Sequence, residues 1–190
     1  YADISRLSFR EKSGFAIRYF ETTVALLRDS MAVKGFALET TNSRIRMNAS
    51  ATYPSLTAAT EDLGSVNGVF RIASTSISLK DVLFLAPTLL DSLPLTLPQT
   101  TTIGVDALAH GSVKKVFLDH LQLHTLESTS LFANGSITSV MDSINRLIDF
   151  KVDRLYTTRS DIRTVLADSL IPASIEIPKW IRVDMAYHGT

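Results

Sequence analysis

The sequence predicts a mostly β protein with about nine or ten strands joined by tight turns and one or two short helices. Apolar and polar residues alternate with a period of two over much of the chain, as in strands with one covered and one exposed face. Segments with helical spacing of apolar residues are few and short. Clusters of Thr, Ser and Asn separate the alternating segments, and these side chains stabilise turns by hydrogen-bonding nearby backbone groups.

The clearest predicted strand covers residues 44–53, where every second residue is apolar and its neighbours are polar. Residues 181–187 repeat this pattern. Less regular alternation predicts further strands at residues 15–27, 31–39, 69–79, 102–109, 116–125, 130–138 and 148–155. In the strand at 31–39 the alternation changes phase near Gly35, which predicts a β-bulge.

Two short helices are predicted. Residues 80–86 follow a strand and end before Pro87, which disfavours continuation of a helix. Residues 160–167 place apolar side chains on one face; Ser160 can cap this helix, and Asp161 suits its positive end.

We expect residues 1–190 to form a single β-rich segment, because a chain of 190 residues has the length of one domain and neither half looks self-sufficient. A weak seam is predicted near residues 93–101, where Pro94 and Pro98 interrupt an extended connector. The chain opens at Tyr1 rather than at a Met, and we interpret it as an internal fragment of a longer protein.

Composition and missing motifs argue against several functional classes. The 19 basic and 19 acidic residues are scattered, so nucleic acid is not an expected partner. Zero cysteines exclude thiol nucleophiles and cysteine-bound metals. His120 and His124 lie about 13 Å apart if they share a strand, too far to ligate one ion. Familiar catalytic and nucleotide-binding motifs are not found, so we expect a non-enzymatic protein with no cofactor and no metal.

The alternating pattern leaves two architectures open. Alternating apolar residues line the core of a closed β-sandwich, and on the pattern alone the sandwich is favoured. A degenerate repeat points instead to an extended groove built from recurring hairpins. The unit at residues 38–45 recurs at 155–162, and a looser copy runs over 123–131.

Several strings resemble segments of the TamB translocation-and-assembly-module proteins of Gram-negative bacteria. In the first half these are LSFREKSGF at 7–15, LETTNSRI at 38–45 and LKDVLFLAP at 79–87. In the second half LQLHT at 121–125 and LFANGSI at 131–137 resemble their strand, turn and strand unit. Residues 155–162, 170–172 and 177–178, leading into 181–190, resemble the unit that follows in Bacteroidetes-like members. The order of several weak motifs carries the resemblance, which is weakest over 56–66 and 94–110.

TamB proteins are similar to the AsmA-like group of bridge-like lipid-transfer proteins. The resemblance therefore implies an elongated, curled antiparallel sheet, shaped like a groove or taco, with an apolar concave face. It implies a periplasmic location, with the parent protein anchored in the inner membrane by a segment outside this chain. The implied partners are phospholipid and, through other regions, a BamA-like or TamA-like outer-membrane barrel. The implied function is to shield phospholipid tails between the inner and outer membranes.

If one strand face lines such a groove, six side chains are candidates for it, and four charged neighbours would face water. The groove candidates are Ile45, Met47, Ala49, Ile181, Val183 and Met185. The water-facing residues would be Arg44, Arg46, Arg182 and Asp184. Each methylene of an acyl tail gains about 0.8 kcal/mol on burial, so such a groove needs no specific polar contact.

Two alternative functions stay open. A chaperone-like protein could assemble outer-membrane β-barrel proteins by adding strands to an exposed sheet edge. A carbohydrate-binding β-domain could instead use scattered residues, namely Trp180, Tyr187, Asp149 and His188. For Trp180 itself, we favour the interpretation that it is a structural plug beside Pro178.

Overall fold

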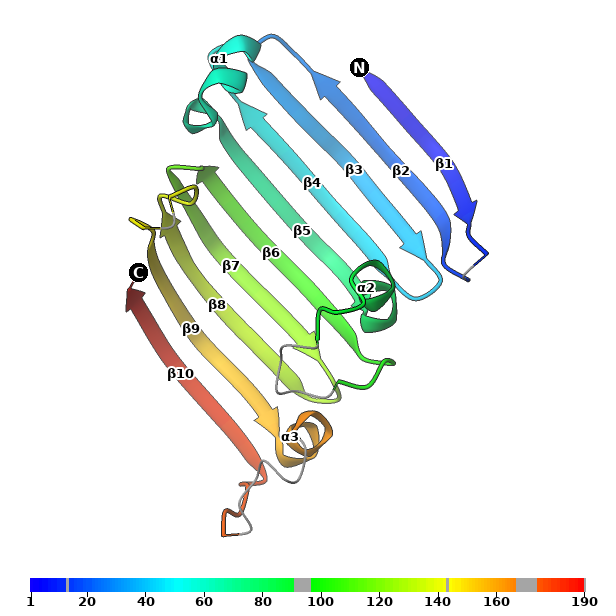
Figure 1. The fold of residues 1–190 in the computed structure, drawn as a ribbon, viewed down its shortest axis with the longest axis vertical. Helices are drawn as coiled ribbons and strands as arrows, with labels where there is room; N and C mark the ends of the chain where they lie inside the picture. Colours follow the sequence, from blue (N-terminus) through cyan, green and yellow to red (C-terminus); the bar gives the residue numbers. More distant parts are fainter. Residues whose placement is uncertain (13, 91–96, 143, 167–173, 190) are drawn as a thin grey trace.

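The described residues form one open antiparallel sheet of ten strands (Figure 1). A computed structural model describes residues 1–190 except 13, 91–96, 143, 167–173 and 190. Each strand pairs with its neighbours in sequence, so the spatial order is β1 to β10. The strands are β1 (Ala2–Arg10), β2 (Ala16–Leu26), β3 (Ser30–Thr40), β4 (Arg44–Thr52), β5 (Asn67–Ser78), β6 (Thr102–Ser112), β7 (Lys115–Thr125), β8 (Thr129–Thr138), β9 (Leu147–Thr158) and β10 (Trp180–Gly189).

Short helices lie at the ends of the strands. The helix α1 (Leu56–Glu61) and the 3₁₀ turn η1 (Leu63–Ser65) connect β4 to β5, while α2 (Leu79–Leu85) follows β5 and α3 (Arg159–Val165) follows β9. Figure 1 shows α2 and α3 at one end of the strands and α1 at the other. No helix in the described ranges has the length and apolar character needed to cross a membrane.

The nine strands predicted from alternation are all present, with ends shifted by a few residues. β1 was not predicted, because its apolar residues change phase between Ile4 and Leu7. The register with β2 shifts at this point, and Arg6 has a positive φ of 58°. The structure also adds α1 and η1, which the sequence did not predict. The predicted cap of α3 is wrong: the helix begins at Arg159, and Thr158 is its N-cap, with Oγ1 accepting a hydrogen bond from the Asp161 amide.

The bulge predicted near Gly35 is confirmed. The register between β3 and β4 shifts between Val33 and Phe36. Gly35 has a φ of +60°, a conformation that favours glycine, and its amide donates a 2.8 Å hydrogen bond to Asn48 Oδ1. The bulge keeps both Val33 and Phe36 on the same face of the sheet.

The sheet is neither closed nor strongly curled. A closed sandwich is wrong for the described residues, because all ten strands belong to one sheet. The strong curl of the predicted taco shape is also not seen, although every one of the nine ladders contains a register shift that raises local twist. The sheet runs on across the predicted seam, since β5 pairs with β6; residues 93–96 of that seam lie outside the described residues.

A buried carboxylate ties α2 to the turn between β3 and β4. Asp81 accepts hydrogen bonds from Thr40 Oγ1 at 2.5 Å, Ser43 Oγ at 2.6 Å and Asn42 Nδ2 at 2.8 Å. Ser43 Oγ in turn accepts a 2.9 Å hydrogen bond from the Ser78 amide. We call this group the Asp81 clamp. It satisfies buried polar groups that would otherwise be costly to bury.

The pKa of Asp81 lies below its usual value. Burial acts to raise the pKa of this carboxyl, but hydrogen bonds from Ser43, Thr40 and Asn42, helped by the charge of Lys80, outweigh burial. The Asp81 clamp therefore favours the ionised carboxylate.

A second clamp ties α3 to the turn between β7 and β8. Asp161 accepts hydrogen bonds from Thr129 Oγ1 at 2.7 Å and from the Ser128 amide at 3.0 Å. Thr129 Oγ1 also lies 2.8 Å from Thr157 Oγ1. We call this group the Asp161 clamp. Asp81 and Asp161 each occupy the third position of a short helix that follows a strand.

The two clamps revise the predicted repeat. Residues 38–45 and 123–131 both run from a strand through a turn into a strand, so the looser copy is the structural equivalent. Residues 155–162 run from a strand into a helix and correspond to the junction of β5 with α2. The repeat thus consists of a turn and the helix that clamps it.

Candidate functional site: the apolar face of the sheet

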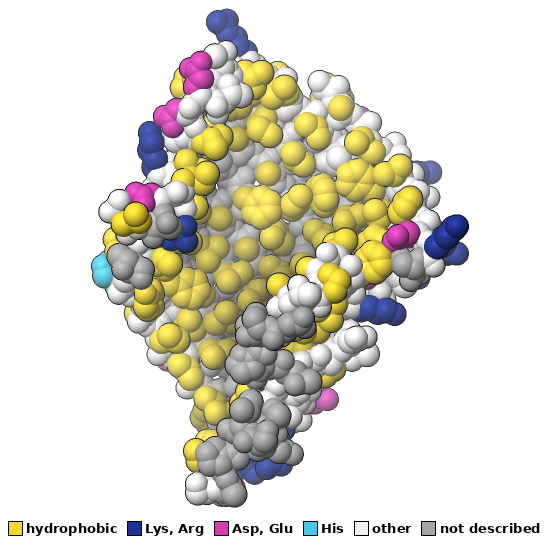
Figure 2. All heavy atoms as spheres, viewed as in Figure 1, with side chains coloured by type: hydrophobic (Ala, Val, Ile, Leu, Met, Phe, Trp, Pro, Cys, Tyr) yellow, Lys and Arg dark blue, Asp and Glu magenta, His cyan; other side chains and the backbone are white. Residues whose placement is uncertain are grey.

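One face of the sheet is apolar across all ten strands. Residues opposite each other in an antiparallel ladder point to the same side, so the register shows which side chains share a face. One row crosses every strand, through Ala2, Val24, Val33, Ala49, Phe70, Ala109, Leu118, Gly135, Phe150 and Tyr187. We call this side the apolar face. Figure 2 shows hydrophobic side chains gathered over it, with charged side chains at its margins.

All six predicted groove residues lie on the apolar face. A second row joins Met47 on β4 to Met185 on β10. The residues between them are Ile72, Ala107, Leu121, Ala133 and Val152. Ala49 belongs to the first row, Ile45 lies opposite Leu38, Val183 opposite Leu155 and Ile181 opposite Thr157. Their role as lipid contacts stays a prediction.

The apolar face is not sealed by a second layer within the described part of the chain. No large side chain among the described residues is fully buried. Phe70, near the middle of the sheet, is 39% exposed, and Met185 on the last strand is 53% exposed. Contiguous exposed apolar surface of this kind is rare on soluble monomers and marks a binding surface.

The helix α2 adds apolar side chains at one end of this face. Phe84 stacks on Phe15 with ring centroids 4.9 Å apart and planes 4° from parallel. Phe84 is still 39% exposed, and Leu85 in the same helix is largely exposed. Because the Asp81 clamp fixes α2 to the sheet, these side chains are held at the margin of the apolar face.

A hollow in the apolar face lies over two glycines. Gly68 and Gly111 face each other across the ladder between β5 and β6. The hollow has a volume of about 280 Å³, and its other apolar lining comes from Ala49, Phe70, Ala109 and Val116. Larger residues at the two glycine positions would fill this space.

Comparison with known proteins assigns no family to this arrangement. No family model, no curated protein and no solved structure matches this chain. Function must therefore be inferred from the residues and geometry of the chain itself.

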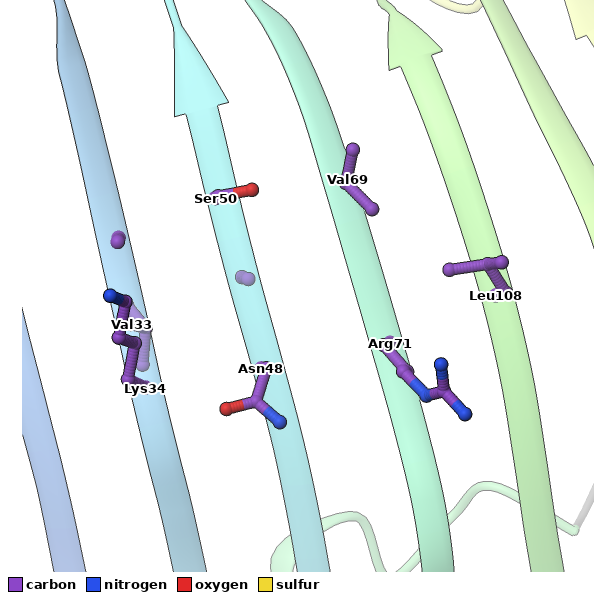
Figure 3. Close-up of a pocket in the computed structure, with 9 residues that line it drawn as sticks. Val33, Lys34, Asn48, Ser50, Val69, Arg71 and Leu108 are labelled. Carbon is purple, nitrogen blue, oxygen red and sulfur yellow. The ribbon is translucent and has the colours of Figure 1, made fainter.

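The opposite face is polar and carries ion pairs between exposed side chains. Glu39 lies 3.0 Å from Arg44 and 3.8 Å from Arg46, and Arg182 lies 3.7 Å from Asp184. These four predicted water-facing side chains, Arg44, Arg46, Arg182 and Asp184, are 56–59% exposed. Figure 3 shows this polar face near β3 to β6, where Lys34, Asn48, Ser50, Val69, Arg71 and Leu108 surround a shallow hollow of about 460 Å³.

The polar face also holds two histidine–aspartate pairs that the sequence did not predict. His110 Nδ1 lies 2.8 Å from Asp119 Oδ2, and His120 Nε2 lies 2.8 Å from Asp106 Oδ1. Each pair joins β6 to β7, so the partners are set by strand register and not by spacing along one strand. Within the described ranges no three metal-binding side chains gather at one point.

The residues proposed for a carbohydrate cleft are not brought together. Tyr187 lies opposite Phe150 on the apolar face, whereas Trp180 shares the polar face with Arg182. Asp149 lies opposite His188 in the ladder between β9 and β10, near the end of β10 that is distant from Trp180. The prediction that these four side chains line one cleft is therefore wrong.

Proposed function

We propose that this chain is a non-enzymatic segment of a TamB-like periplasmic protein, whose apolar face shields phospholipid tails between the inner and outer membranes. The observation that supports this function best is the unbroken row of apolar residues from β1 to β10 on a face without a second layer in the described ranges. The order of TamB-like strings in the sequence supports the same family, with the parent protein anchored in the inner membrane.

Physical chemistry supports a lipid tail as the occupant. With strands about 4.8 Å apart, ten strands give a face roughly 45 Å long in the direction of the rows. An acyl tail lying along a row would gain about 0.8 kcal/mol per buried methylene without any polar contact. A uniform apolar surface also binds an acyl tail about equally at every position, which suits movement of the tail along the face.

Photo-crosslinking tests this function with matched positions on the two faces. A photoreactive residue at Met47 or Val183, in the full-length protein in cells, should capture phospholipid. The controls are Ser50 and Asp184, which lie on the same two strands but point to the polar face. No lipid adduct from Met47 and Val183, or equal adducts from all four positions, would contradict the proposal.

A second candidate function is strand addition to nascent outer-membrane β-barrel proteins. In its favour, β1 and β10 each have only one strand partner among the described residues, and β1 is exposed along its whole length. Unpaired edge strands offer backbone donors and acceptors to another chain. Crosslinks from Ser8 on β1 or Ala186 on β10 to barrel precursors, with no lipid captured at Met47, would favour this function over lipid shielding.

A further inference from the structure

A hollow on the polar face, at the corner formed by β8, β9 and β10, combines two arginines with two aromatic rings. It has a volume of about 490 Å³ and is lined by Ser130, Arg154, Tyr156, Trp180 and Arg182. The register explains the grouping: Ser130 lies opposite Tyr156, and Tyr156 lies opposite Arg182. Arg154 and Trp180 come two residues before Tyr156 and Arg182, so they share that face. We call this site the Trp180 hollow.

The two guanidinium groups have unused hydrogen-bond donors. Arg154 lies over the ring of Phe132, 4.2 Å from its centroid, and has no acidic partner among the described residues. Arg182 lies 3.7 Å from Asp184, and both side chains are 57% exposed. Guanidinium groups match the oxygens of phosphate in geometry as well as in charge, and one phosphate has enough oxygens for two arginines.

The aromatic side of the hollow is equally open. Trp180 is 59% exposed, so the interpretation of this side chain as a structural plug is wrong. In the described part of the chain, the hydroxyls of Ser130 and Tyr156 and the indole N–H of Trp180 have no hydrogen-bond partner. An aromatic face with nearby free hydroxyls suits a sugar ring, which stacks through its C–H groups and hydrogen-bonds through its hydroxyls.

We propose that the Trp180 hollow binds a sugar phosphate. Arg154 and Arg182 hold the phosphate, Trp180 supports the sugar ring, and Ser130 and Tyr156 hydrogen-bond its hydroxyls. The site lies on the face opposite the groove candidates, so it does not depend on the proposed lipid function.

Trp180 is the only tryptophan in the chain, so intrinsic tryptophan fluorescence reports on this hollow alone. The purified chain is titrated with glucose 6-phosphate, glucose and inorganic phosphate. We expect a saturable change with glucose 6-phosphate, and binding at least about tenfold weaker for each of the other two, because each lacks half of the contacts. The proposal is overturned by the absence of a saturable change, or by inorganic phosphate or glucose binding as tightly as the sugar phosphate.

Variants separate this site from general electrostatic attraction. Arg154→Gln and Arg182→Gln should each weaken glucose 6-phosphate binding by about tenfold or more, since each removes a charge-assisted hydrogen bond. Asp184→Asn should tighten binding, because it frees Arg182. The control Arg71→Gln removes a cation from the same face at β5 and should leave the affinity unchanged. Circular dichroism confirms folding of each variant. Unchanged affinity in both arginine variants, or an equal loss in Arg71→Gln, would overturn the proposal.

Discussion

Met47 on β4 and Met185 on β10 lie in one cross-strand row on the apolar face, joined through an unbroken series of opposed residues. Strand register alone connects them, because each strand pairs only with its sequence neighbours. A polar substitution in this row changes the surface of the face without opening a closed core.

We predict that Met47→Glu and Met185→Glu each lower the amount of phospholipid that co-purifies with the protein. A carboxylate placed against an acyl tail loses hydration without gaining a partner. Ser50→Glu, on the opposite face of the same strand, is the matched control and should leave the lipid content unchanged. Mass spectrometry of extracted lipid measures the outcome. Equal lipid in Met47→Glu and Ser50→Glu would show that the apolar face does not hold the lipid.

The Asp81 clamp should contribute measurably to stability. Asp81→Asn replaces a carboxylate that accepts three side-chain hydrogen bonds, and we expect it to lower the free energy of unfolding by about 1–3 kcal/mol. Urea denaturation followed by circular dichroism measures the loss. Asp62→Asn is the control, because Asp62 is exposed and makes mainly local bonds at η1. A change no larger than that of the control would mean that the clamp is not important for stability.

The same carboxylate should make stability depend on acid pH. Because the pKa of Asp81 is lower in the folded protein than its usual value, its contribution is complete above about pH 5 and declines as the pH falls through the folded pKa. We therefore expect the urea concentration at the denaturation midpoint to stay high near neutral pH and to decrease once the pH is below about 4. The fall should be smaller in Asp81→Asn. Identical pH profiles for the two proteins would contradict this assignment.

Two glycines on the apolar face should respond differently to alanine. A Cβ at Gly135 would lie 2.3 Å from the Asp149 carbonyl oxygen, so the backbone of β8 or β9 must shift. We expect Gly135→Ala to lower the free energy of unfolding by about 1–3 kcal/mol. A Cβ at Gly68 meets nothing closer than 3.6 Å, so Gly68→Ala should be neutral or stabilise by up to about 1 kcal/mol. Thermal denaturation compares them, and equal losses would refute the steric argument.

Alternation predicted the strands well because each strand has one apolar and one polar face. Residues 44–53 show this most clearly, and Met47 and Asn48 indeed point to opposite sides. Gly35 marked its bulge because the phase of the pattern changes there. In contrast, β1 has only two alternating apolar residues on each side of Arg6, which is too short a pattern to predict a strand. The positive φ of Arg6 is visible only in the structure.

The sequence pattern could not predict which elements contact each other. Asp81 reaches Ser43 across 38 residues, and nothing in either segment alone indicates that contact. The partners of His110 and His120 likewise depend on the register between β6 and β7. Arg154 and Trp180 lie on different strands, and the segment between those strands includes a helix, so only the folded sheet brings them into one hollow.

The simple strand order has a consequence for how such a chain can change in length. Because no strand crosses over another, inserting or deleting one complete hairpin leaves the direction and partners of all remaining strands intact apart from the junction. Duplication of one hairpin therefore offers an evolutionary route to a longer sheet that needs no redesign of existing pairs.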